Sequence, residues 1–221
     1  MKIPLFKTYS DAGDEKTVTK VVSSGLNWSV GPEIDLFEKK LSEYCGTKYA
    51  LTLNSGTSAL FSGLSALGIK KDDEVIVPAF TYIASVHPIS LLGATPVFAD
   101  IEDISCGLDP LDVESKITKK TKAIIAVHYA GFPCQIEKLR KIAKKNKIFL
   151  IEDAAESLGS KTNGKMTGTF GNFGIIRFSQ SKILSCGDGG AILTNDRSIY
   201  DRARIIRDLG RRCKSDKTFS D

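Results

Sequence analysis

The segment IEKLRKIAKKNKIFLIEDAAE (residues 136–156) is the part of the chain from which the fold class follows most readily. Its first half, Ile136–Asn146, places apolar residues at helical spacing among lysines, which predicts an amphipathic basic helix. The run Ile148–Ile151 (IFLI) is continuously apolar, as is typical of a strand that a parallel sheet buries on both faces. Asp153 lies two residues after that run, at the edge where such sheets bind ligands. The segment therefore predicts a helix–strand unit that ends in a carboxylate.

The same alternation of apolar runs and helical patterns continues in both directions along the chain. We predict strands at Tyr49–Asn54, Glu74–Val77, Thr95–Ala99, Ala123–Val127, Ile175–Phe178 and Ala191–Thr194. We predict helices at Thr57–Leu67, Tyr82–Leu92 and Ser198–Leu209, although Pro88 is unfavourable inside the second of these. Such alternation favours an α/β protein with three layers, α/β/α, around a mostly parallel mixed sheet.

Composition excludes several other classes of protein. The chain has 221 residues, 42% of them hydrophobic and 26% charged, which suits one large globular domain or two small ones. No window approaches the ~18 apolar residues of a transmembrane helix, so we expect no membrane partner. The N-terminus lacks the apolar core of a signal peptide, and we therefore expect a cytoplasmic protein.

Cysteines, histidines and lysines give no sign of a metal or nucleic-acid site. The five cysteines form no CxxC pattern, so we expect ordinary thiols at Cys45, Cys106, Cys134, Cys186 and Cys213. The only histidines, His87 and His128, are too few for a His-rich metal site. The net charge is +5, and the lysine-rich stretches 116–122 and 141–147 contain no interleaved aromatic residues. They favour solvated helix faces over a phosphate or nucleic-acid patch.

Polar motifs lie between the predicted strands and the elements that follow them. In Asn54–Ala59 (NSGTSA), Gly56 and the hydroxyls of Thr57 and Ser58 stand at the start of a helix. Backbone N–H groups and the helix dipole make such a place suitable for a phosphate. A plain Ser/Thr helix N-cap is the alternative interpretation.

Two charged side chains complete a candidate site. Asp153 is costly to bury unless it meets a cation, such as a protonated cofactor nitrogen, or caps a helix. Lys182 precedes the glycine-rich turn Cys186–Gly190, and partial desolvation would make it a nucleophile for Schiff-base chemistry. A surface lysine is the alternative. Phosphate, ring nitrogen and aldehyde occur together in pyridoxal 5′-phosphate (PLP), so the motifs jointly predict a PLP site.

The same motifs resemble those of the DegT/DnrJ/EryC1/StrS sugar aminotransferases, a family of fold-type I (aspartate aminotransferase-like) PLP enzymes. The resemblance covers essentially the whole chain, in the blocks VGPE, NSGTSAL, DEVIVPAFTYIAS, LLGATPVFADI, TKAIIAVHYAG, IEDAAESLG and FSQSKILSCGDGGAILTND. It implies an N-terminal segment (1–30) and a PLP-binding large domain (31–221). It also leads us to expect that the family's smaller C-terminal domain is missing.

The resemblance implies catalytic and cofactor-binding roles for individual residues. Lys182 matches the lysine that forms the internal aldimine and moves the proton, and Asp153 matches the carboxylate that pairs with the pyridinium nitrogen. Gly56, Thr57 and Ser58 match the cradle that binds the cofactor phosphate.

Four further positions are implied with less specific roles. Tyr82 matches an aromatic residue that stacks on the cofactor, and Glu156 matches a residue near its 3′-oxygen. His128 is a weaker candidate for the substrate side of the active site. Arg177 stands where the family usually has a phosphate-binding serine, so an arginine there would either strengthen phosphate binding or displace the phosphate.

The implied reaction is a ping-pong transfer of an amino group from an amino acid, commonly glutamate, to a keto-sugar that is usually nucleotide-linked. Relatives with histidine in place of the lysine act as dehydratases, so Lys182 favours transamination. We expect a homodimer, or a partner that carries the missing C-terminal half. The alternative is a non-catalytic or split-enzyme subunit of the PLP fold. A Rossmann-type nucleotide binder does not fit, because no GxGxxG follows the first strand.

Overall fold

A computed structural model describes residues 3–4, 6–25 and 31–211 of the chain. Val30 of the VGPE block and the predicted thiol of Cys213 lie outside the described residues. The cysteines within the described part are free thiols, at Cys45, Cys106, Cys134 and Cys186.

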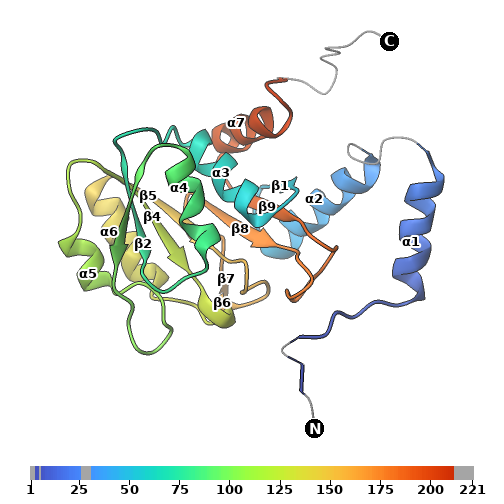
Figure 1. Cartoon of the computed structure of the whole chain (residues 1–221), viewed down its shortest axis with the longest axis horizontal. Coiled ribbons are helices and arrows are strands. Elements are labelled where there is room, and N and C mark those ends of the chain that lie inside the picture. The colour runs from blue at the N-terminus through green and yellow to red at the C-terminus, as the bar shows by residue number, and fades with distance from the viewer. Residues whose placement is uncertain (1–2, 5, 26–30, 212–221) are drawn as a thin grey trace.

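A seven-stranded mixed sheet forms the centre of the molecule, in the order β1-β9-β8-β5-β4-β2-β3 (Figure 1). Its strands are β1 (Tyr49–Leu53), β2 (Glu74–Pro78), β3 (Thr95–Ala99), β4 (Thr121–Val127), β5 (Phe149–Asp153), β8 (Phe173–Arg177) and β9 (Gly190–Thr194). Strands β8, β5, β4, β2 and β3 run parallel, while β9 pairs antiparallel with both β1 and β8. The mostly parallel mixed sheet is confirmed.

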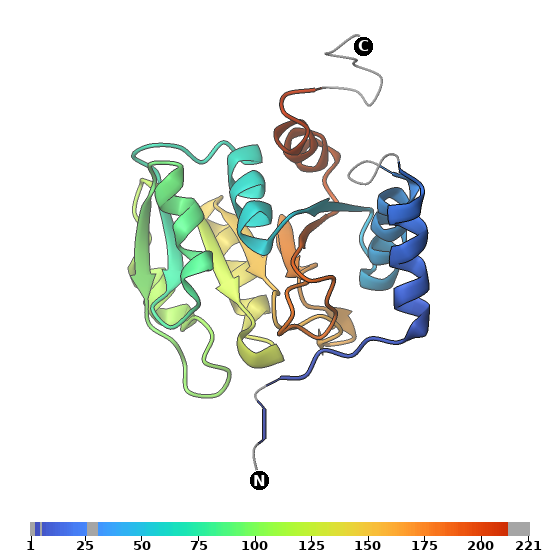
Figure 2. The same cartoon turned by 45° about the vertical axis from the view of Figure 1, so that its right-hand side comes forward.

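Helices cover both faces of the sheet (Figures 1 and 2). On one face, α3 (Gly56–Ala66), α4 (His87–Leu91) and α7 (Arg197–Arg207) share a hydrophobic cluster with the strands. On the other face, the helices are α2 (Pro32–Cys45), α5 (Pro110–Ser115) and α6 (Ile136–Asn146). This arrangement confirms the three-layer α/β/α architecture.

Helix α6 and strand β5 form the unit that the sequence predicted. Helix α6 has the predicted bounds, and it buries Ile136, Leu139 and Ala143 while its lysines face outward. Strand β5 begins one residue later than predicted and continues through Asp153. Because parallel neighbours pair with β5 on both sides, Leu150 and Ile151 are buried.

The predicted helix Tyr82–Leu92 is wrong as a single element. The segment forms a 3₁₀ turn, η1 (Ile83–Ser85), and then the short helix α4, which carries Pro88 in its first turn. Proline lacks an N–H and clashes with the preceding turn, so it starts a new helix more readily than it continues one. The sequence prediction also missed α1 (Ala12–Ser23), α2, α5 and the hairpin of β6 (Lys161–Thr162) and β7 (Lys165–Met166).

Helix α1 lies at the margin of the described structure (Figure 1). Asp11 and Asp14 form a capping box at its N-terminus, and the helix buries none of its residues. Across the described ranges, no helix is long and apolar enough to cross a membrane. The same ranges contain no group of His, Cys, Asp and Glu side chains suited to a metal ion.

Candidate active site

A cleft of about 310 Å³ lies at the C-terminal edge of the parallel strands, beside the first turn of α3. It brings together residues that are far apart in the sequence but end neighbouring elements. The sequence-predicted residues on its wall are Gly56, Thr57, Tyr82, Asp153, Glu156, Arg177 and Lys182. Ser58 and His128 are not on the wall.

Asp153 is held at the end of β5 by two donors. Its Oδ2 accepts a hydrogen bond from Ser85 Oγ at 2.7 Å, and its Oδ1 accepts one from Ala155 N–H at 3.1 Å. The residue is only 7% exposed, and this burial raises the pKa of the carboxyl group. The next element after β5 is the short strand β6 and not a helix, so the alternative role of Asp153 as a helix N-cap is wrong. The site therefore contains a buried carboxylate with space beside it for a cationic partner.

Lys182 is paired with Glu156 inside the cleft. Lys182 Nζ lies 2.8 Å from Glu156 Oε1, and Glu156 Oε2 accepts the N–H of Ala130 at 2.8 Å. Burial opposes ionisation of Glu156, but the hydrogen bonds from Lys182 and Ala130 outweigh it and hold the pKa below its usual value. The Lys182 side chain is 15% exposed, so the surface-lysine alternative is wrong.

The first turn of α3 contributes backbone donors to the cleft. Ser55 is the N-cap: its Oγ accepts the N–H of Ser58 at 3.1 Å and lies 3.0 Å from the Ser58 hydroxyl. Ser58 thus contacts Ser55 and is not on the cleft wall, and its implied place in the phosphate cradle stays a prediction. The N–H groups of Gly56 and Thr57 have no acceptor within the helix. The helix cap and an anion site are therefore compatible at this turn.

Arg177 ends β8 directly beside that turn. A Cβ atom added to Gly56 would lie 3.3 Å from Arg177 Cβ, so the glycine allows the arginine to pack closely against α3. The Arg177 guanidinium lies 5.7 Å from the centre of the Tyr82 ring, and its Nε is 3.9 Å from Asp188 Oδ1. That Nε atom is buried and has no hydrogen-bond acceptor. A buried cationic donor next to a helix N-terminus fits a phosphate group.

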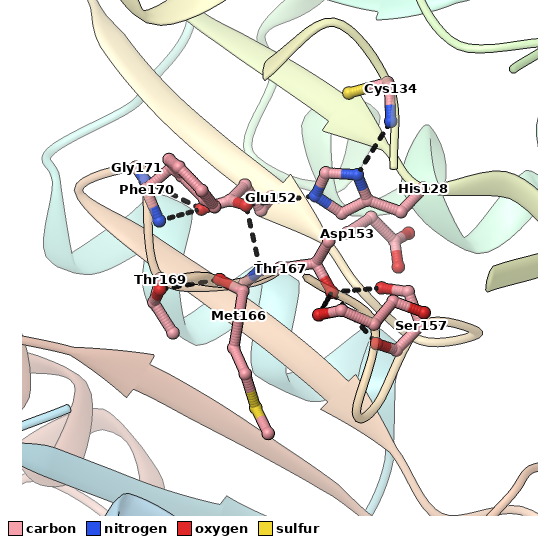
Figure 3. A network of polar contacts seen from close by, with 12 residues as sticks. His128, Cys134, Glu152, Asp153, Ser157, Met166, Thr167, Thr169, Phe170 and Gly171 are labelled. Atoms are coloured by element: carbon pink, nitrogen blue, oxygen red, sulfur yellow. Dashed lines mark hydrogen bonds and ion pairs between the residues drawn. The ribbon is translucent and has the colours of Figure 1, made fainter. Parts of the chain in front are cut away.

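His128 belongs to a buried network behind the cleft (Figure 3). Its ring is fully buried, with Nε2 3.0 Å from Glu152 Oε2, and Nδ1 accepts the N–H of Cys134 at 3.2 Å. The ring is therefore satisfied on both nitrogens and does not reach the cleft wall. The structure thus does not place His128 on the cleft wall, and its implied contact with substrate stays a prediction.

Sequence reasoning missed several residues that line the cleft. Ser85 donates a hydrogen bond to Asp153, its hydroxyl lies 2.9 Å from that of Thr81, and Tyr129 also lines the cleft. Thr81 and Ser85 both fall in the FTYIAS block. The helix predicted for Tyr82–Leu92 gave no reason to expect Ser85 beside β5. The only signal was their position immediately after β2, at the ligand-binding edge.

The chain is similar to known aminotransferases. The sequence profile of the DegT/DnrJ/EryC1/StrS aminotransferase family matches residues 9–221. The chain belongs to this family. GDP-perosamine synthase of Escherichia coli O157:H7 is 43% identical over 208 residues, which are 94% of this chain and 57% of that protein.

Solved structures agree with the family assignment. The aminotransferase from Psychrobacter cryohalolentis matches with a TM-score of 0.89 at 35% identity, covering 93% of this chain and 53% of that one. A GDP-4-keto-6-deoxymannose-3-dehydratase with a trapped PLP-glutamate geminal diamine matches with a TM-score of 0.88 at 31% identity, covering 95% and 55%. The chain thus spans little more than half the length of these relatives.

Proposed function

We propose that this chain is the cofactor-binding part of a PLP-dependent sugar aminotransferase. It would move an amino group from an amino acid, glutamate, to a nucleotide-linked keto-sugar. The observation that carries the proposal is the Lys182–Glu156 pair at 2.8 Å in a cleft that also contains Asp153 and Arg177. The similarity to GDP-perosamine synthase and to a structure holding PLP and glutamate supports the substrate classes.

The residues of the cleft fit the chemical groups of PLP. The buried Nε of Arg177 and the N–H groups of Gly56 and Thr57 would hold the phosphate. Asp153, kept in place by Ser85, would pair with the ring nitrogen. When bound, PLP supplies an electron sink conjugated to an aldehyde.

Lys182 would act as both the attachment point and the proton carrier. Its Nζ is the amine in the cleft, and Glu156 Oε1 at 2.8 Å fixes its direction. The hydrogen bonds from Lys182 and Ala130 lower the pKa of Glu156, so this carboxylate would stay ionised beside the Lys182 nitrogen. The Lys182 side chain is 15% exposed, so most of it is shielded from solvent within the cleft. A lysine at this position favours transamination over the dehydration named for one structural relative.

A half-reaction tests the proposal without the sugar acceptor. We expect the chain to gain visible absorbance with PLP, and added glutamate to abolish that absorbance while releasing one equivalent of 2-oxoglutarate. Lys182→Ala removes the amine and should give neither signal. Lys122→Ala, a change at an exposed lysine on β4, is the matched control and should behave as wild type. PLP binding with no 2-oxoglutarate would favour the non-catalytic or split-enzyme alternative.

A further inference from the structure

The turn that holds Glu156 is anchored from behind by a buried hydrogen-bond network around Glu152. Strand β4 ends at Val127, His128 follows, and the turn η2 (Tyr129–Gly131) comes next. The Ala130 N–H in this turn donates to Glu156 Oε2 at 2.8 Å. Ala130 has a φ of +51°, a left-handed conformation that costs an L-residue free energy. Surrounding contacts must therefore hold the turn in place.

Behind this turn, Glu152 is the centre of a network of buried hydrogen bonds that includes His128, the residue before the turn (Figure 3). This fully buried carboxylate accepts N–H groups of Gly168 at 2.8 Å, Phe170 at 2.5 Å and Gly171 at 2.7 Å. His128 Nε2 is the fourth partner, at 3.0 Å. Since His128 Nδ1 accepts a backbone N–H, the proton lies on Nε2 and points at Glu152. The network ties the end of β4 to β5 and to the loop that leads into β8.

Side chains alternate along a strand, so Glu152 and its neighbour Asp153 project to opposite sides of β5. Asp153 faces the cleft, whereas Glu152 faces the network behind it. The backbone joins the two sides, because His128 N–H donates to the Asp153 carbonyl at 3.1 Å. The His128–Glu152 pair thus fixes the residue that precedes the strained turn.

From these contacts we infer that His128 and Glu152 are a positioning pair: they hold the Tyr129–Gly131 turn so that Ala130 N–H orients Glu156 against Lys182. The order of contacts is Glu152 to His128, His128 through the turn to Ala130, then Glu156 and Lys182. Neither residue of the pair touches the cleft. The inference rests on the proposed function only for the role it gives to Lys182.

The test uses the full, cofactor-free chain and two readouts. Carboxyl NMR of ¹³C-labelled glutamate gives the titration midpoint of Glu156, and amide hydrogen exchange gives the protection of Ala130. His128→Leu removes both hydrogen bonds of the ring. We expect the Glu156 midpoint to rise by about half a pH unit or more, and Ala130 exchange to become about tenfold faster or more. The midpoint rises because Glu156 loses a donor that lowers its pKa.

Two further variants keep the test decisive. His128→Gln keeps a donor toward Glu152, so the Glu156 midpoint and the Ala130 exchange rate should change in the same direction but by less. This variant provides the test if His128→Leu does not fold. Adding Ala130→Gly, which adopts a positive φ without strain, should restore part of the Glu156 midpoint. The other ionisable groups on the cleft wall, Asp153, Arg177, Lys182, Tyr82 and Tyr129, are unchanged in every variant.

Thr194→Val is the control for a merely structural effect. Thr194 is also buried, and its Oγ1 donates to the Asn172 carbonyl at 2.8 Å at the edge of the sheet opposite the cleft. This variant should lower the melting temperature and leave both readouts unchanged. Wild-type values of the midpoint and of Ala130 exchange in the folded His128 variants would overturn the inference. Failure of PLP to bind wild type would instead overturn the proposed function, and it would leave these readouts intact.

Discussion

Asp153 gains its proposed role at a cost to the stability of the cofactor-free chain. Burial raises its pKa in the folded state, so the protonated form favours folding. The stability that Asp153 contributes is therefore present at pH values below its unfolded pKa and is lost as the pH rises through the folded value. A cationic cofactor nitrogen would reverse this penalty by pairing with the carboxylate.

Asp153→Asn separates these two effects. We expect the cofactor-free variant to have a higher melting temperature than wild type at neutral pH, because no buried charge remains. PLP affinity should fall by about ten- to hundredfold, since a charge-assisted hydrogen bond contributes roughly 1.5–3 kcal/mol. Differential scanning calorimetry and absorbance titration give the two values. Changes of the same sign in stability and affinity would contradict the assigned role.

The family resemblance implies a phosphate-binding serine at position 177, where this chain has an arginine. Its buried Nε lacks a hydrogen-bond acceptor, which is the state expected of a donor awaiting an anion. Arg177→Ser should weaken PLP binding by about tenfold or more, and inorganic phosphate should compete less strongly. Arg197→Ser on α7 makes the same change of charge at an exposed arginine paired with Asp201, and should leave PLP affinity unchanged. Equal affinities in the two variants would show that Arg177 does not bind the phosphate.

At the scale of elements, the cleft depends on a close approach between the start of β9 and the N-cap of α3. A Cβ atom added to Gly190 would lie 2.4 Å from the Ser55 carbonyl group, so any side chain there must push α3 away. Gly190→Ala should destabilise the chain by about 1–3 kcal/mol and also weaken PLP binding. Denaturant unfolding and absorbance titration measure the two effects.

Gly68→Ala is the matched control for that change. Gly68 has a φ of +80°, and an added Cβ would meet no atom within 4 Å. The substitution should cost about 1–2 kcal/mol of stability through backbone strain alone, with unchanged PLP affinity. A loss of affinity equal to that of Gly190→Ala would mean that stability, rather than the position of α3, limits binding.

Elements were predictable where their signals are local. The apolar spacing of Ile136–Asn146 and the continuous run before Asp153 gave α6 and most of β5, since both patterns reflect burial on known faces. The prediction of one helix over Tyr82–Leu92 was wrong because the hydrophobic period continues across Pro88, whereas a single helix does not. Short or weakly buried helices such as α1 and α5 lack the long periodic pattern that would reveal them.

Contacts between distant residues mark the limit of prediction for the site. Lys182, Asp153 and Gly56 could be chosen because each follows or precedes a strand in a recognisable motif. The Ser85–Asp153 bond and the Ala130–Glu156 bond could not, because they join separate loops after the sheet has formed. The contact between His128 and Glu152 could not be predicted for the same reason, because it joins the residue after β4 to a side chain of β5.

For the whole molecule, the layered sheet places one lysine, one buried carboxylate and one helix N-terminus around a single cleft. Attachment of PLP to Lys182 is the step on which the other assignments depend. Reduction of the PLP-loaded chain with borohydride, followed by proteolysis and mass spectrometry, locates the attachment. We expect one dominant pyridoxyl adduct, on the peptide that contains Lys182. An adduct spread over the exposed lysines, or concentrated on another residue, would contradict it.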